Sequence, residues 1–242
     1  MTSSFDQLAD QYDTLWTDSA VGRFQRQAVW RIIDPLFSPG ASVLDLGCGT
    51  GVDALHLMAA GIKVCGIDAS SAMVRVAQGR GVTARILPIE QLDQLAGPLD
   101  GAISNFGPLN CVSCLERVAE TLARLIVPGG RLALCLMGRC CAWEICHYLS
   151  RGRPAKAFRR WRTAVESLGV RVTYPSVRRL KAVFRGKFRL DFWRGIGLLV
   201  PPSYVSLSER TLAQLAAADR RIAGLPLPRA LADHRVLVFT RL

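Results

Sequence analysis

The sequence has few acidic residues and few histidines, and it lacks long apolar runs. Its 242 residues include 19 Asp and Glu against 31 Lys and Arg, for a formal net charge of +12, and three histidines. No apolar stretch approaches the roughly 18 residues that a membrane-spanning helix needs. The first residues show neither the basic nor the apolar region of a signal peptide. The eight cysteines are therefore expected to be reduced thiols in a cytoplasm.

The cysteines also lack the spacing of a metal site. Cys111-x-x-Cys114 has no second C-x-x-C pair to complete a zinc site, and Cys140-Cys141 with Cys146-His147 is the other cluster. We predict no metal site and expect most of the cysteines to pack as small apolar side chains.

Apolar residues make up 50% of the chain, enough for one sizeable core. Short apolar runs predict strands over 42–46, 63–67, 84–87, 101–104 and 131–137, with helical patterns between them. This alternation is typical of a doubly wound α/β fold. We expect a mostly parallel, seven-stranded sheet with helices on both faces, completed by strands over 188–196 and 235–240 and a helix over 207–222.

A glycine-rich turn, Gly47-x-Gly49-x-Gly51, lies between the first strand and the following helix, and Asp68 ends the second strand. Such a turn lets the backbone approach a ligand, and the acid can accept hydrogen bonds from ribose hydroxyls. A dinucleotide-dependent dehydrogenase shares this arrangement. Val52, however, stands where the dinucleotide pattern has a third small residue. Asp45 would also repel a pyrophosphate, whereas it suits the cationic amino group of a methionine moiety.

Four segments, 43–51, 66–73, 100–106 and 127–132, resemble successive motifs of the Rossmann-like (class I) S-adenosylmethionine-dependent methyltransferases of small-molecule type. The resemblance covers about residues 40–138. It implies S-adenosylmethionine as the cofactor and the following cofactor-binding residues: Tyr12, Arg23, Asp45, Gly47, Cys48, Gly49, Gly51, Asp68, Ala69, Met73, Ile89, Glu90, Asn105 and Phe106.

Three of these residues follow from finer resemblances. The segment from Phe5 to Asp13 is similar to the N-terminal helix of small-molecule members, in which the equivalent of Tyr12 lies against the cofactor. The spacing from Arg23 to Asp45 resembles the glycine N-methyltransferase group, where an Arg binds the cofactor carboxylate. Pro88 stands where many members carry an acid that bonds adenine, so this contact is expected to be absent or to move to Glu90.

We predict a division of the chain into four parts, because the alternation of strands and helices breaks down beyond Gly138. Residues 1–40 are expected to form a helical lid over the cofactor, 41–138 the cofactor-binding core, 139–185 a basic and aromatic helical cap inserted after the fifth strand, and 186–242 the end of the sheet. Within the cap, we predict an apolar helical stripe of Phe158, Trp161, Val165 and Leu168.

Methyl transfer mainly requires desolvation and alignment, and a base only where the acceptor must lose a proton early. The candidate catalytic residues are His147 and Tyr12, and the predicted acceptor contacts are Trp143, His147 and Tyr148. His147 also fits a packing role, and His234 fits a turn.

The region 139–194 holds about half of the basic residues but only three acids, Glu144, Glu166 and Asp191. It fits nucleic-acid binding, contact with a membrane surface, or a cap over the active site. Its apolar content favours the cap, so we predict methyl transfer to an O or N atom of a small, lipophilic or aromatic metabolite rather than nucleic acid. An RNA or protein methyltransferase that uses 139–194, and a non-catalytic adenosylmethionine-binding protein, stay open. The sequence does not indicate an oligomeric state.

The first testable prediction concerns cofactor choice. S-adenosylmethionine and S-adenosylhomocysteine should bind with affinity on the order of micromolar, while NAD and NADP should not bind, because Asp45 and Val52 oppose a pyrophosphate. Calorimetry measures all four ligands. Tight NAD binding without an adenosylmethionine signal would contradict the interpretation.

Overall fold

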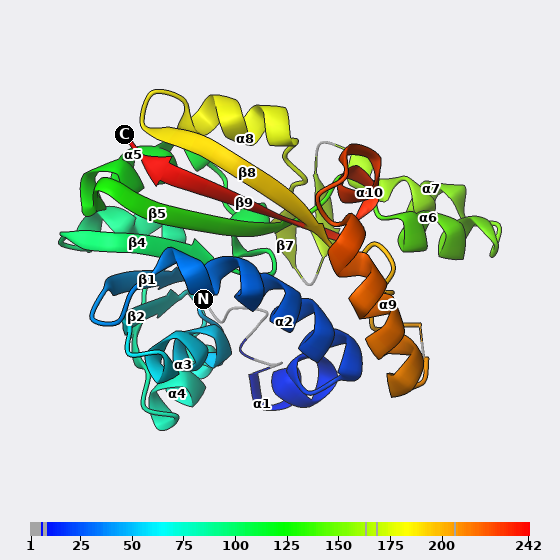
Figure 1. Ribbon diagram of the computed structural model, residues 1–242, viewed down its shortest axis with the longest axis horizontal. Helices are drawn as coiled ribbons and strands as arrows, with labels where there is room; N and C mark the ends of the chain where they lie inside the picture. Colours follow the sequence, from blue (N-terminus) through cyan, green and yellow to red (C-terminus); the bar gives the residue numbers. More distant parts are fainter. Residues whose placement is uncertain (1–5, 7–8, 163, 168, 206) are drawn as a thin grey trace.

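The centre of the structure, a computed structural model, is a seven-stranded sheet (Figure 1). The structure describes all residues except 1–5, 7–8, 163, 168 and 206. The first five strands in spatial order are parallel, and the sixth is antiparallel to both of its neighbours. In spatial order they are β3 (Thr83–Ile86), β2 (Lys63–Asp68), β1 (Ser42–Leu46), β4 (Leu99–Ser104), β5 (Ile126–Met137), β9 (His234–Arg241) and β8 (Phe188–Ile196). The predicted α/β class and sheet are thus confirmed.

Side chains alternate between the two faces of the sheet, because successive residues of a strand point to opposite sides. On β5, Leu132, Leu134 and Leu136 join the core on one face, while Ala133 and Cys135 join the core on the other. The first face is covered by α5 (Leu115–Leu125) and α8 (Val177–Phe184), and the second by α2 (Ala20–Ile33), α3 (Val52–Ala59) and α4 (Ser71–Gly79). This two-sided burial explains the continuous apolar runs of the central strands.

The remaining elements lie at the edges of this body (Figure 1). None of the described helices combines the length and apolar character that crossing a bilayer requires. The elements are α1 (Ala9–Tyr12), the π-helix η1 (Asp13–Thr17), the 3-10 turns η2 (Asp34–Leu36), η3 (Ile89–Gln94), η4 (Pro108–Asn110) and η5 (Arg159–Trp161), α6 (Ala142–Leu149), α7 (Pro154–Ala157), the strands β6 (Val165–Ser167) and β7 (Val170–Val172), α9 (Glu209–Ile222) and α10 (Pro226–Leu231).

The insertion after β5 is not purely helical. β6 and β7 form an antiparallel hairpin where we predicted a helical stripe, so that prediction is wrong for Val165; Leu168 lies outside the described residues. Valines at 165, 170 and 172 favour extended backbone, and Gly169 has a positive φ of 69° that suits the turn. Trp161, 53% exposed, also stands off the core.

A buried ion cluster fastens this insertion to the sheet. Arg160 donates to Glu144 and Asp233, at 2.7 Å in each case, and to the backbone carbonyl oxygens of Gly138 and Asp233. All three side chains are at most 8% exposed. Burial alone would raise the pKa of Asp233, but His234 and Arg160 hold it below its usual value. The cluster ties α6 and η5 to the start of β9.

This cluster generates a stability prediction. Arg160→Met should lower the free energy of unfolding by about 3–5 kcal/mol, because it leaves buried Asp233 without its arginine and leaves Glu144 paired with Arg159 alone. Denaturant unfolding measures the change. Arg162→Ala, which removes the same charge from an exposed position, serves as the control and should stay within about 0.5 kcal/mol of the parent protein. Equal effects of the two substitutions would show that the cluster does not stabilise the fold.

Candidate functional site

The strand order reverses between β1 and β4, the place where open α/β sheets bind ligands beyond their strand ends. The glycine turn after β1 lies there, and its three glycines all have positive φ. A Cβ on Gly47 would come within 2.4 Å of Pro108, and one on Gly51 within 3.0 Å of Ala77. Around Gly49 a Cβ would meet nothing, so the backbone of this residue faces open space.

A cavity of about 450 Å³ opens in front of this turn. Its lining combines polar residues at the glycine turn and β2 with an apolar wall on the opposite side. The lining residues are Tyr12, Gly47, Gly49, Asp68, Ala69, Met73, Ile89, Glu90, Asn105, Phe106, Gly107, Pro108, Cys111, Val112, Met137, Val170 and Val172. Ten of the predicted cofactor residues are among them.

Asp68 sits at the end of β2 with both carboxylate oxygens engaged. It accepts hydrogen bonds from the backbone N–H groups of Gly49 at 2.9 Å and Ser70 at 2.8 Å. Burial raises its pKa above the usual value despite these bonds. Each carboxylate oxygen has a further lone pair, so Asp68 can still accept hydrogen bonds from a diol such as ribose.

Two buried groups of opposite charge, Arg26 and Asp45, each have a side-chain atom without a hydrogen-bond partner among the described residues, although neither lines the cavity. Arg26 forms an ion pair with Asp53, whose other oxygen accepts from the indole N–H of Trp30 at 2.7 Å. The Nε of Arg26 and the Oδ2 of Asp45 have no hydrogen-bond partner among the described residues. Burial and the neighbouring Asp53 raise the pKa of Asp45 well above its usual value, and Arg26 only partly offsets this. A carboxylate and an ammonium on one carbon, the α-amino acid group, would complement this pair of atoms.

The N-terminal segment closes this end of the site. The Asp13 carboxylate accepts from Thr50 of the glycine turn at 2.8 Å and pairs with Arg80 at 2.6 Å. The Trp16 ring packs edge-on against Phe106, and the guanidinium of Arg26 lies over both rings. Burial raises the pKa of Tyr12 to about 12, so that it stays a neutral phenol.

Four of the predicted cofactor residues do not line the cavity: Arg23, Asp45, Cys48 and Gly51. Arg23 points to the surface, where it pairs with Glu209 at 2.6 Å. Cys48 is buried against Gly66, and Gly51 packs on α4. The buried arginine of α2 is Arg26. The sequence carried a signal for this choice, because Arg26 shares the three- and four-residue spacing of the buried Val29 and Ile33, while Arg23 does not.

The predicted acceptor contacts lie on α6, away from the cavity lining. Trp143, His147 and Tyr148 are all absent from it, and His147 instead packs against Tyr148 and Tyr204. Arg151 and desolvation lower the pKa of His147. The apolar wall of the cavity consists of Val170 and Val172 of β7 and Met137 at the end of β5. The sequence did not indicate that these residues line the site.

Asn110 holds this wall in place. Its side chain donates to the Thr173 carbonyl at 2.7 Å and accepts from the Met137 N–H at 2.9 Å, and its own carbonyl accepts from the Thr173 N–H at 2.7 Å. Asn110 is fully buried, so these bonds fix the spacing of three segments. The hairpin therefore stands over the carboxyl ends of β4 and β5.

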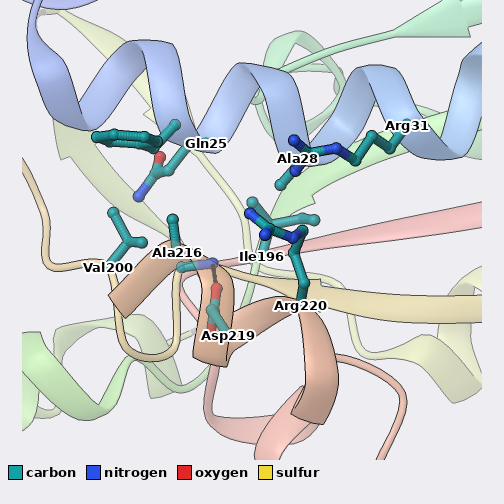
Figure 2. Close-up of a pocket in the computed structure, with 10 residues that line it drawn as sticks. Gln25, Ala28, Arg31, Ile196, Val200, Ala216, Asp219 and Arg220 are labelled. Atoms are coloured by element: carbon teal, nitrogen blue, oxygen red, sulfur yellow. Dashed lines mark hydrogen bonds between the residues drawn. The ribbon is translucent and has the colours of Figure 1, made fainter. Parts of the chain in front are cut away.

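A second cavity lies between α2 and α9 and holds about 10 Å³, enough for one water molecule and no substrate. Figure 2 shows Gln25 and Ala28 of α2 facing Ala216 and Asp219 of α9. Asp219 accepts hydrogen bonds from the backbone N–H groups of residues 197–199. This carboxylate anchors the loop after β8, a structural role. Among the described residues, no group of three or more His, Cys, Asp or Glu is placed to hold a metal ion.

Comparisons with known proteins agree with this geometry. Residues 43–130 match the methyltransferase domain family. The chain is 33% identical over 138 residues to a demethylmenaquinone methyltransferase of Corynebacterium kroppenstedtii, covering 54% of this chain and 57% of that protein. It is 31% identical over 109 residues to a ubiquinone biosynthesis O-methyltransferase of Xanthomonas oryzae, covering 41% and 44%. These matches span about half the length of the relatives.

The fold as a whole also has a solved counterpart. A methyltransferase structure from Thermotoga maritima, described as a possible histamine N-methyltransferase, superposes with a TM-score of 0.61 at 18% identity and covers 98% of this chain and 97% of that one. Residues 43–130 therefore match a methyltransferase domain, and the sheet has the Rossmann-like fold of methyltransferases that use S-adenosylmethionine as their cofactor. The residues present fit this cofactor, because the glycine turn and Asp68 suit its ribose, while the unpaired atoms of Arg26 and Asp45 suit its amino-acid end.

Asp45 generates a pH prediction. Because its pKa is raised, Asp45 takes up a proton at a higher pH than an ordinary carboxyl group does, and an ammonium ligand requires the ionised form. S-adenosylhomocysteine should therefore bind more tightly as the pH rises through the elevated pKa of Asp45. Asp45→Asn should weaken binding by about tenfold or more and flatten the pH profile. Calorimetry at a series of pH values from acidic to about pH 8 measures the dissociation constant of S-adenosylhomocysteine for the parent protein and for the variant. An identical pH profile in the variant would contradict this role.

Proposed function

Because residues 43–130 form a methyltransferase domain, we propose that the protein transfers a methyl group from S-adenosylmethionine to an oxygen or nitrogen atom of a small, apolar or aromatic molecule. The observation that carries the proposal is a single cavity with two unlike halves. One half presents the glycine turn, Asp68 and Glu90, and the other presents Met137, Val170 and Val172. A polar donor and an apolar acceptor suit these halves.

At the donor end, the residues bind and orient. Asp68 accepts hydrogen bonds from the ribose hydroxyls, and the open backbone at Gly49 lets the cofactor lie close to the turn. Arg26 and Asp45 hold the carboxylate and ammonium of the amino-acid end, with Tyr12 and Trp16 above them. When bound, S-adenosylmethionine supplies a methyl group on a positively charged sulfur, which departs with the electron pair of the broken C–S bond.

At the acceptor end, the wall excludes water and aligns the incoming atom. Met137, Val170 and Val172 contribute apolar surface, and Val172 is only 6% exposed. No histidine lines the cavity among the described residues, and the neutral Tyr12 phenol is a hydrogen-bond donor rather than a base. This lining suits an acceptor whose nucleophilic atom already has a free lone pair or is readily ionised.

The names of the relatives support an aromatic acceptor. One relative is named as a demethylmenaquinone methyltransferase and the other for ubiquinone biosynthesis, and a quinol presents a hydroxyl or ring atom on an apolar body. The apolar wall would accept such a ring. We therefore propose a small acceptor with an aromatic ring and do not assign a particular quinone.

The two competing functions make different demands on the same site. An RNA or protein methyltransferase would need basic residues in the acceptor half, whereas no Lys or Arg lines the cavity among the described residues. A non-catalytic binding protein would keep Arg26, Asp45 and Asp68 and show no turnover. Transfer of a labelled methyl group to a panel of phenols, catechols and quinols distinguishes both from a small-molecule enzyme.

The wall generates a kinetic prediction. Val172→Ala should raise the acceptor KM roughly five- to tenfold, because it removes apolar contact, while the S-adenosylhomocysteine Kd stays within about twofold. His147→Ala should leave both constants unchanged if the wall, and not α6, holds the acceptor. Loss of turnover in His147→Ala with normal turnover in Val172→Ala would reverse the assignment and place the acceptor against α6.

A further inference from the structure

A second large hollow lies on the other side of the β7 wall. Its volume is about 460 Å³, and Arg139, Trp161, Arg162, Tyr174, Ser176 and Arg179 line it; we call it the arginine groove. It adjoins the main cavity directly, since both share Val112, and Val172 of the cavity is followed in the chain by Thr173 of the groove. Asn110 holds Thr173 at this boundary.

The groove carries an excess of positive charge. Three guanidinium groups line it against one carboxylate, Glu116, which pairs with Arg179. Arg162 forms no ion pair or side-chain hydrogen bond with any described residue, and Arg139 reaches only the Trp161 carbonyl, at 3.5 Å. Arg159 and Arg160, by contrast, both pair with Glu144, and Arg160 also pairs with Asp233. Arg139 and Arg162 of the groove therefore have no acidic partner among the described residues.

The other lining groups suit an oxyanion attached to a ring. Trp161 is 53% exposed, and its ring contacts only one other aromatic ring among the described residues, that of Phe158. Ser176 caps the N-terminus of α8, accepting from the Arg179 N–H at 3.1 Å, so the positive end of the helix also faces the groove. Guanidinium groups bind carboxylates and phosphates in bidentate fashion, and an exposed indole stacks on planar rings.

We propose that the arginine groove binds the carboxylate or phosphate group of an acidic acceptor whose ring-bearing part extends past β7 into the main cavity. Val172 lines the cavity and Tyr174 lines the groove, and two residues of extended chain span about 7 Å. The acidic group of the acceptor is therefore held away from the methylated atom rather than beside it. The inference rests on the proposed function for the position of the reacting atom. The capture of an oxyanion by Arg139, Arg162 and Arg179 does not depend on methyl transfer.

The binding test uses protein saturated with S-adenosylhomocysteine, with phenyl phosphate, benzoate and inorganic phosphate as probes and benzyl alcohol as the neutral counterpart. Arg162→Ala should weaken phenyl phosphate binding about tenfold or more, the range for one charge-assisted hydrogen bond. Arg185→Ala removes the same charge from an exposed position at the end of α8, outside the groove, and should change the Kd less than twofold. Calorimetry at about 0.15 M salt screens long-range interactions between charges, so that the measured change reports contacts within the groove.

Several outcomes would overturn the proposal. Equal weakening by Arg162→Ala and Arg185→Ala would show a general charge effect. Binding of inorganic phosphate as tightly as phenyl phosphate, unchanged in Trp161→Ala, would indicate a free-anion site rather than an acceptor subsite. Tighter binding of single-stranded RNA or of anionic vesicles, lost on Arg162→Ala, would assign the groove to a macromolecule or a membrane surface. An unchanged S-adenosylhomocysteine Kd confirms that the variants are folded.

A kinetic test connects the groove to turnover. Phenols that bear a carboxylate are compared with their methyl esters as acceptors, and Arg162→Ala should raise KM for the acids only. If no phenol is methylated but phenyl phosphate binding still depends on Arg162, the proposed function fails and the oxyanion site stands. If acids and esters respond alike, the groove is not part of the acceptor site, while the methyltransferase proposal is unaffected.

Discussion

The buried ion pair between Arg26 and Asp53 is the constraint on which the site depends. It joins α2 to the first turn of α3, directly behind the glycine turn, with Trp30 bonded to the same carboxylate. Because Arg26 is committed to Asp53, Asp45 is left as a buried carboxylate without a cation of its own. An unpaired buried charge is unfavourable, and the raised pKa of Asp45 reflects this cost. In the proposed function, Asp45 receives the ammonium group of the cofactor.

The rest of the site is arranged around this fixed end. The N-terminal segment covers Arg26 through Trp16 and is fastened to the glycine turn through Asp13. At the far end, Asn110 fixes the β7 hairpin over the strand ends, and the Arg160 cluster fixes the remainder of the insertion to β9. The cavity is therefore enclosed by segments distant in sequence, each held by buried polar contacts that have few alternative arrangements.

Local patterns in the sequence were sufficient for the sheet, the glycine turn and Asp68, because strand alternation, glycine spacing and strand-end acids are short-range features. The acceptor side was not predictable in the same way. The hairpin is a pair of three-residue strands, too short for a periodic signal, and its position depends on Asn110, about 60 residues earlier. The choice of Arg23 over Arg26 followed spacing from a resemblance, whereas helix-face periodicity selects Arg26. The aromatic residues of α6 suggested acceptor contacts, whereas the apolar residues that line the cavity come from β7 and the end of β5.

The most direct test of this account is a crystal structure of the protein with S-adenosylhomocysteine. The account predicts that the carboxylate of the ligand lies within hydrogen-bond distance of Arg26 Nε, its ammonium within reach of Asp45 Oδ2, and its ribose against Asp68, with the Arg26–Asp53 pair intact. A ligand whose amino-acid end points away from Arg26 and Asp45, or one that binds outside the cavity in front of Gly47 and Gly49, would contradict it.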